Sequence, residues 1–183
     1  MLLLHAQTAR LELREFTIDD IANIYALESI PSVARYQKWP PRTWLEAEDV
    51  IREIVDDQKS IPREHFELAV WHGRTFIGRV GANVKDGQAS LWYSFMPAWN
   101  GKGFATEAMK AFISLLGPVR LKIECDPRNT RSWRLAERLG FAKIRLTEKE
   151  FVCKGEWVGS LVYQKEPPPP PCLETIEEDE ESS

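Results

Sequence analysis

A loop with two glycines joins a predicted strand to a predicted helix in the middle of the chain. The strand, Ala89 to Met96, is stopped by Pro97, and the helix runs from about Gly103 to Leu116. Backbone amides at a helix start lack partners within the helix, and the helix dipole makes that end partly positive. Glycines allow a ligand to approach the backbone closely. The segment Asn100 to Ala108, which reads N-G-K-G-F-A-T-E-A, therefore predicts a phosphate site.

The elements before this loop bear on what kind of phosphate site it is. Phe66 to Trp71 and Thr75 to Asn83 flank a short turn, and with the strand that follows they predict an antiparallel meander. A dinucleotide-binding loop opens the first unit of a parallel sheet and needs a third glycine, where Thr106 stands here. The dinucleotide interpretation is therefore disfavoured, while a plain strand-to-helix turn stays open as the simpler alternative.

The rest of the chain predicts an α/β (α+β) domain. Thr17 with Asp20, and Thr43 with Glu46, have the spacing of capping boxes that begin helices, and Pro31 is expected to end the first helical region. The other predicted elements are strands near 10–14, 119–125, 145–153 and 157–164 and a helix over 130–139.

Composition separates a domain from a tail. Six of the 28 acidic residues and five consecutive prolines lie in 167–183, which predicts a disordered, Pro-rich and acidic tail after a domain spanning 1–166. The domain itself is nearly neutral and has no basic stripe, which argues against nucleic-acid binding. No apolar run reaches the roughly 18 residues of a membrane span. Three distant cysteines without ligand spacing predict no metal site and a reduced, cytoplasmic location.

Two segments resemble the signatures of the GNAT superfamily of N-acetyltransferases. Asn100 to Ala105 resembles the acyl-CoA loop, with Asn100 in place of the usual Gln or Arg, as in the Rim-type (RimJ/RimL-like) branch. Asp126 to Phe141, D-P-R-N-T-R-S-W-R-L-A-E-R-L-G-F, is similar to the second signature, N-x-x-S followed by L-G-F. The resemblance extends over about residues 8–166.

The resemblance implies a GNAT fold: a central, mostly antiparallel mixed sheet of about six to seven strands, flanked by about four helices, with a splayed strand pair that binds CoA. It implies transfer of the acetyl group of acetyl-CoA to a primary amine, either a protein N-terminus or a small molecule, by direct attack in a ternary complex. Such an enzyme is a monomer or homodimer and needs no metal. Two alternatives stay open: a CoA-binding regulatory domain without turnover, and an interaction domain whose partner binds the tail.

Site residues also follow from the resemblance. The expected cofactor-binding residues are Phe95, Met96, Asn100, Gly101, Lys102, Gly103, Phe104, Ala105, Thr106, Asn129 and Ser132. An amide near Met96 is the expected oxyanion donor. Many family members use a Tyr four residues after the Ser as general acid, but Ala136 stands there, so Ser132 is the candidate acid, or else only a helix cap.

The sequence offers several candidates for the general base and for the acceptor pocket. Glu124 and Glu150, with Glu148 beside them, are the candidate bases, or else solvated strand charges. Three tryptophans line an acceptor pocket or belong to the core: Trp39, Trp44 and Trp99. The three histidines are expected at the surface or in turns: His5, His65 and His72.

Overall fold

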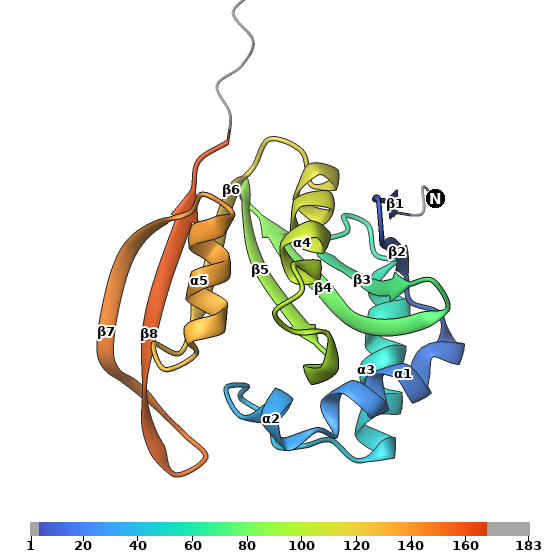
Figure 1. Cartoon of the computed structure of the whole chain (residues 1–183), viewed down its shortest axis with the longest axis horizontal. Helices are drawn as coiled ribbons and strands as arrows, with labels where there is room; N and C mark the ends of the chain where they lie inside the picture. The colour runs from blue at the N-terminus through green and yellow to red at the C-terminus, as the bar shows by residue number, and fades with distance from the viewer. Residues whose placement is uncertain (1–3, 168–183) are drawn as a thin grey trace, which may run out of the picture.

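The computed structural model describes residues 4–167, so all but the first residue of the predicted tail lies outside the described residues (Figure 1). The described part forms one eight-stranded sheet with the order β1-β2-β3-β4-β5-β6-β8-β7 and five α-helices. The strands are β1 His5–Gln7, β2 Glu12–Glu15, β3 His65–His72, β4 Thr75–Lys85, β5 Gln88–Phe95, β6 Arg120–Cys125, β7 Ala142–Cys153 and β8 Glu156–Lys165. The helices are α1 Ile21–Glu28, α2 Pro31–Ala34, α3 Trp44–Asp57, α4 Phe104–Leu115 and α5 Thr130–Arg138.

The predicted mixed, mostly antiparallel α/β fold is confirmed, with one strand and one helix more than expected. The extra strand is β1, whose three residues are too short to show an alternating pattern. The extra helix is α2, which begins at Pro31. Proline was expected to end a helix there, but at the first helical position its missing N–H would have had no partner anyway.

Both predicted capping boxes are present. In the one before α3, the Thr43 backbone N–H donates to Glu46 Oε2 at 2.7 Å, and the Glu46 N–H donates to Thr43 Oγ1 at 3.4 Å. Thr17 and Asp20 form the corresponding pair before the short 3₁₀ turn at Ile18–Asp20, which leads into α1. These local contacts place α1 and α3 where the sequence predicts them, because a capping box satisfies backbone amides that the helix itself leaves free.

The two faces of the sheet carry different helices. On one face α4 and α5 pack over the central strands, and this core includes Leu68, Leu91, Phe112 and Ile123. On the other face α1 and α3 enclose a smaller core, and Figure 1 shows both helices beside β3. Because alternate residues of a strand point to opposite faces, each strand supplies side chains to both layers.

The strands β5 and β6 are parallel, whereas the other neighbouring strands are antiparallel. Their pairing starts at Gln88 with Arg120 and ends at Leu91 with Ile123. The last residues of β5, 92–95, still pair with β4 but have no pairing partner on β6. The strands therefore part at their carboxyl ends, which confirms the expected splayed pair.

Candidate active site

The glycine loop leads from the end of β5 into the uncapped start of α4. Gly101 and Gly103 have φ angles of +76° and +81°, in the left-handed region that favours glycine. Gly103 is the residue before the first turn of α4, and no side chain caps the amides of that turn. A Cβ added at Gly101 would meet no atom within 4 Å, so this backbone faces open space. The first amides of α4 are thus available to an anion.

Arg10, from the segment between β1 and β2, holds this loop in place. Its guanidinium donates to the Lys102 carbonyl oxygen at 3.1 Å and lies 4.3 Å from the centre of the Phe104 ring. Glu107 accepts hydrogen bonds from Arg10 Nε at 2.7 Å and from Thr8 Oγ1 at 2.6 Å. Burial opposes ionisation of Glu107, but these hydrogen bonds outweigh it and lower its pKa. Glu107 is therefore a structural residue that ties the N-terminal segment to α4.

The predicted cation of the loop, Lys102, points elsewhere. Its Nζ donates to the Ala98 carbonyl oxygen at 2.9 Å and lies 5.3 Å from the centre of the Trp99 ring. Trp99 in turn packs edge-on against Phe104, with 5.4 Å between ring centres. Lys102 is not among the residues that line the cleft described next, so its contacts in this structure stabilise the loop.

A cleft of about 1180 Å³ runs from this loop between α4 and α5. Its walls come from the end of β5, the glycine loop, α4, α5 and the segment around α2. Of the predicted cofactor-binding residues, it is lined by Phe95, Asn100, Gly101, Gly103, Phe104, Ala105, Thr106, Asn129 and Ser132. Met96 and Lys102 do not line it. The tertiary structure thus brings together two segments that are about thirty positions apart in the sequence.

Because β5 and β6 part, backbone groups near the end of β5 have no partner on β6. The Met96 N–H already donates to the Ile77 carbonyl oxygen at 2.8 Å, so it points toward β4. Alternate residues of a strand direct their backbone groups to opposite neighbours. The amides of Tyr93 and Phe95 therefore point toward the gap beside β6, where the described strands offer no ladder partner. The amide that faces the gap is therefore that of Phe95 and not that of Met96.

Ser132 lies in the first turn of α5, where it is buried and in contact with a residue of β5. Its Oγ is 2.8 Å from the Tyr93 hydroxyl, which also donates to the Ser132 carbonyl oxygen at 2.9 Å. Burial raises the pKa of Tyr93, although the contact with Ser132 acts in the opposite direction. Tyr93 was not among the predicted site residues. A tyrosine on a strand gives no sequence signal of function, since most are core residues.

The cap of α5 is made by Asn129. Its Oδ1 accepts from the Ser132 backbone N–H at 3.4 Å. The side chain of Asn129 makes the cap, so the Ser132 hydroxyl is not used as a cap and contacts the Tyr93 hydroxyl instead. Asn129 lines the cleft, and with its Oδ1 used in the cap it still has its amide NH₂ as a donor.

The two predicted carboxylates lie outside the cleft. Glu124, near the end of β6, accepts from Ser160 Oγ at 2.7 Å and pairs with Lys122 Nζ at 2.7 Å. Burial opposes its ionisation, but these two partners prevail and lower its pKa. Glu150, on β7, pairs with Arg145 at 3.1 Å. Neither residue lines the cleft, and Glu150 lies on the strand at the far edge of the sheet.

A second cavity of about 330 Å³, which we call the inner pocket, opens on the opposite face of the sheet beside α3. Its lining includes Gln37, Tyr93 and Ser94, which also line the cleft, so the two cavities meet at the end of β5. Of the three tryptophans considered for an acceptor pocket, Trp39 lines the inner pocket, whereas Trp99 lines the cleft. Trp44 lines neither and packs against Tyr25.

Charged residues of α1, β3, β4 and the loop before α3 form a network at the inner pocket. Arg79 pairs with Glu28 and with Glu67, and Arg42 also pairs with Glu28. His65 Nε2 lies 3.1 Å from Glu67. The hydrogen bond to Glu67 raises the pKa of His65, against the effect of its partial burial. His65 was expected at the surface, because the sequence shows no sign of residues so far apart meeting beneath α3.

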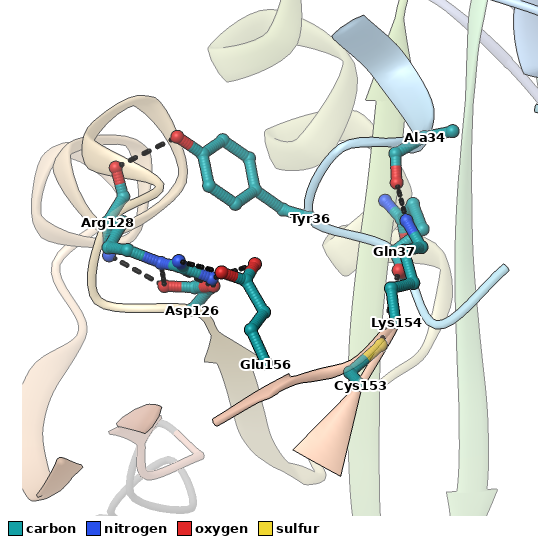
Figure 2. A network of polar contacts seen from close by, with 8 residues as sticks. All are labelled: Ala34, Tyr36, Gln37, Asp126, Arg128, Cys153, Lys154 and Glu156. Carbon is teal, nitrogen blue, oxygen red and sulfur yellow. Dashed lines mark hydrogen bonds and ion pairs between the residues drawn. The ribbon is translucent and has the colours of Figure 1, made fainter. Parts of the chain in front are cut away.

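Residues 34–37, which we call the strap, cross between the two cavities and the end of the β7–β8 hairpin (Figure 2). The Lys154 Nζ donates to the Ala34 carbonyl oxygen at 2.7 Å, and the Tyr36 hydroxyl donates to the Arg128 carbonyl oxygen at 3.4 Å. Figure 2 shows Arg128 held by Asp126 and Glu156, at 2.6 and 3.2 Å. The strap is therefore anchored at both ends.

We also searched the described part of the chain for a metal site and for a membrane-spanning helix. Within residues 4–167, no group of three His, Cys, Asp or Glu side chains is arranged to hold a metal ion. No helix in the same range is long and apolar enough to cross a membrane.

Comparisons with known proteins bear on the family and the fold of this chain. Residues 10–142 match the model of the acetyltransferase (GNAT) domain. The chain is 30% identical to the uncharacterised N-acetyltransferase p20 of Bacillus licheniformis, over 82% of this chain and 89% of that protein.

Solved structures show the same fold at low sequence identity. The ribosomal L7/L12 alpha-N-protein acetyltransferase RimL in complex with coenzyme A superposes with a TM-score of 0.77 at 16% identity, covering 87% of this chain and 95% of RimL. The microcin C7 self-immunity acetyltransferase MccE, in complex with acetyl-CoA and AMP, gives 0.76 at 22% identity, covering 87% of this chain and 93% of MccE.

Proposed function

The chain belongs to the acetyltransferase (GNAT) domain family and is an acetyl-CoA-dependent acetyltransferase, and from this premise we propose that it acetylates a primary amine that reaches the thioester from the inner pocket. The observation that carries the proposal is the meeting of the two cavities at Tyr93 and Ser94. Acetyl-CoA in the cleft and an amine in the inner pocket would approach each other there from opposite faces of the sheet.

The donor would bind along the cleft. The uncapped amides at the start of α4, next to Gly101 and Gly103, would hold the diphosphate. The pantetheine arm would lie in the gap between β5 and β6, where the Tyr93 and Phe95 backbone groups face it and Asn129 lines the wall. A backbone with free donors and acceptors on one edge can bind an extended ligand as if it were another strand.

The reaction would be a direct aminolysis of the thioester. The neutral amine attacks the carbonyl carbon, a C–N bond forms, and the negative charge on the oxygen is stabilised by the Phe95 amide. The tetrahedral intermediate formed by this attack then collapses, and its C–S bond breaks. The leaving thiolate takes a proton from the Ser132 hydroxyl. Tyr93, whose hydroxyl is 2.8 Å from Ser132 Oγ, would pass to the serine a proton that it takes from water in the cleft, so that both hydroxyl groups end the reaction in their neutral form.

Glu124 would accept the proton that the amine loses. By the strand register, Glu124 and Lys122 share a face with Ser90 and Ser94 of β5, which is the face of the inner pocket. The Glu124 carboxylate is ionised at neutral pH, as a base requires, but its lowered pKa makes it a weaker base than an ordinary glutamate. Glu150 lies farther along the sheet edge and pairs with Arg145, so it is the weaker candidate.

The acceptor would be a protein N-terminus or a small amine. RimL, which shares the fold, is named for acting on an α-amino group, and the pattern Asn100 to Ala105 resembles the Rim-type branch. The strap and the β7–β8 hairpin are tied together by Lys154 beside the meeting point of the two cavities.

The test is release of free thiol from acetyl-CoA in the presence of a panel of primary amines. The panel holds peptides with free N-termini, the same peptides with blocked N-termini and one lysine, and small amines. We expect turnover with a free N-terminus or a small amine, and a product heavier by one acetyl group in mass spectrometry. CoA binding in calorimetry without thiol release across the whole panel would refute catalysis and leave a binding domain.

A further inference from the structure

The wall of the inner pocket that α3 forms carries two carboxylates. Glu53 and Asp57 stand one turn apart, so they share a face of the helix, and both line the pocket. Glu53 takes part in no ion pair among residues 4–167, and the ion pairs of Asp57 in this range are limited to His65, at 3.8 Å. We call Glu53 and Asp57 the acidic pair.

The arginines of the inner pocket are already neutralised by other carboxylates. Arg79 pairs with Glu28 and Glu67, and Arg42 pairs with Glu28 at 2.6 Å, so two arginines are balanced by two buried glutamates. The imidazole of His65 carries at most one positive charge against the two carboxylates of the acidic pair. The α3 wall of the pocket therefore keeps a negative charge, which favours a cationic ligand.

The other end of the inner pocket holds a buried hydroxyl group. Ser94 is 9% exposed, and no hydrogen bond within the described residues involves its side chain. It lines both cavities. A buried polar group without a partner is costly, and a ligand that bonds to it removes that cost. Ser94 therefore points to a polar group of a ligand at the place where the two cavities meet.

Strand register gives the spacing between these two ends of the pocket. Ser94 stands opposite Arg79 on β4, and Arg79 is four positions, or about 13 Å, from Asn83. Asn83 is paired with His65 in the ladder, and Asp57 lies 3.8 Å from that histidine. The acidic pair and Ser94 can therefore hold two groups of one ligand that are roughly 10 Å apart.

Apolar side chains line the inner pocket between its polar ends. Val50 and Ile54 of α3 belong to this lining, together with Trp39 and Trp92. The middle strand of the lining, β4, uses its backbone groups in ladders with β3 and β5. A peptide backbone would therefore find no partner on this strand, whereas a chain of methylene groups needs none. The pocket thus suits a short aliphatic chain with a polar group at each end.

We propose that the acceptor is an aliphatic diamine, with one amine at Ser94 and a second, protonated amine at the acidic pair. This inference rests on the proposed route of the acceptor through the inner pocket, and it narrows that acceptor to one class. The neutral amine donates an N–H to Ser94 Oγ and undergoes the aminolysis proposed for this site, which yields a monoacetylated diamine and free CoA. Roughly six methylene groups span the distance between the two ends.

The experiment compares diaminohexane with hexylamine, which has the same chain but lacks the second amine. Thiol release from acetyl-CoA by the full chain gives kcat/KM for each. We expect the diamine to be preferred at least about tenfold, of which about twofold reflects its two equivalent amines. The preference should shrink at high salt, because a partly exposed ion pair is screened. The double variant E53Q/D57N should lose most of it, because kcat/KM falls more for the diamine than for hexylamine.

Two further variants separate charge at the acidic pair from other effects. Asp56, on the same helix, is exposed, pairs with Lys59 and lines neither cavity, so Asp56→Asn should keep the wild-type preference. Ser94→Ala should lower kcat/KM about fivefold for both amines and leave their ratio unchanged, because Ser94 contacts the amine that both ligands share.

The outcomes distinguish this inference from the proposed function. Equal kcat/KM for the two amines beyond the factor of about two, or an equal loss for both in the folded double variant, would overturn the inference. Turnover with peptide N-termini alone would also overturn it, yet would leave the proposed function standing. Absence of thiol release with every amine would contradict the proposed function and this inference with it.

Discussion

At the scale of single residues, the proposed chemistry depends on two hydroxyl groups that come from different elements. Ser132 begins α5 and Tyr93 lies on β5, and their oxygens are 2.8 Å apart at the wall of the cleft. Ala136 occupies the position where many members of the family have a tyrosine, and Ala136 is fully buried. In the proposed mechanism, the pair of Tyr93 from β5 and Ser132 from α5 would take the place of that tyrosine as the proton donor.

We expect Ser132→Ala to lower kcat about a hundredfold or more, the size of a general-acid contribution. CoA affinity should change little, because the cap of α5 uses the Ser132 backbone N–H, which alanine retains. Tyr93→Phe should also lower kcat, and the double variant should lose less than the sum of the two effects, since both act on one proton. Steady-state kinetics and calorimetry test this, and an unchanged kcat in Ser132→Ala would exclude the serine as the acid.

The His65 network makes a prediction about stability rather than turnover. Its hydrogen bond with Glu67 raises the pKa of His65 above the usual 6.5, although partial burial acts the other way. A raised folded-state pKa adds stability that is complete below about pH 6.5 and disappears as pH rises through the folded-state pKa. Each tenfold gain in the proton affinity of the folded-state imidazole adds about 1.4 kcal/mol. The wild-type chain should therefore have a higher free energy of unfolding than His65→Gln, and this difference should be larger at about pH 6 than at about pH 9.

Urea unfolding of both proteins at several pH values measures this difference. Asp57, 3.8 Å from His65, and Asn83 also face the ring, so Asp57→Asn serves as a control for the weaker contact. The Asp57→Asn variant should reduce the pH dependence of the unfolding free energy only partly. A difference between wild type and His65→Gln that is the same at every pH would show that the histidine does not gain a proton in the folded state.

At the scale of elements, the glycine loop and α4 act as one unit. Gly101 has φ +76° and open space around it, so a substitution there tests the ligand without a clash. Asn and Asp both tolerate the left-handed region. We expect Gly101→Asp to bind CoA at least about tenfold more weakly than Gly101→Asn, because only the aspartate places a negative charge near the diphosphate.

Calorimetric titration with CoA, together with circular dichroism to confirm that both variants are folded, tests this prediction. The comparison isolates charge, since the two side chains have nearly the same shape. Equal CoA affinity of the aspartate and asparagine variants would show that the diphosphate binds away from Gly101.

At the scale of the whole molecule, the sheet separates the two cavities in which we propose that the two substrates bind. The cleft lies on the face of α4 and α5, the inner pocket lies beside α3, and both reach the end of β5. The parallel pair of β5 and β6 is where the sheet opens. A single sheet with helices on both faces can thus bring two ligands to one gap without a second domain.

The domain boundary gives a prediction at the same scale. The last strand, β8, ends at Lys165, and Arg120 pairs with Glu166 at 2.9 Å. Both cavities are lined entirely by residues that precede this point. We therefore expect truncation after Glu166 to leave kcat, the KM for acetyl-CoA and the unfolding temperature unchanged within error. A loss of activity in the truncated but folded chain would assign a role to 167–183.

Features that depend on neighbouring residues could be predicted from the sequence alone. The capping boxes at Thr43 and Thr17, the glycine loop and the strands of the meander depend on turn chemistry and on period, which act within a few residues. The phosphate loop and the family resemblance arise at the same scale. For this reason most helices and strands lie within about two residues of their predicted bounds.

Only the tertiary structure decided what meets across the sheet. In the folded chain the Met96 amide donates to Ile77, whereas the Phe95 amide faces the gap between β5 and β6. The Tyr93 hydroxyl contacts Ser132, and His65 lies beside Glu67 in the charged network next to α3. Strand register decides these contacts, because a shift by one residue moves a side chain to the other face and a backbone amide to the other neighbour. That register is set by the packing of the whole sheet, which no single segment of the sequence encodes.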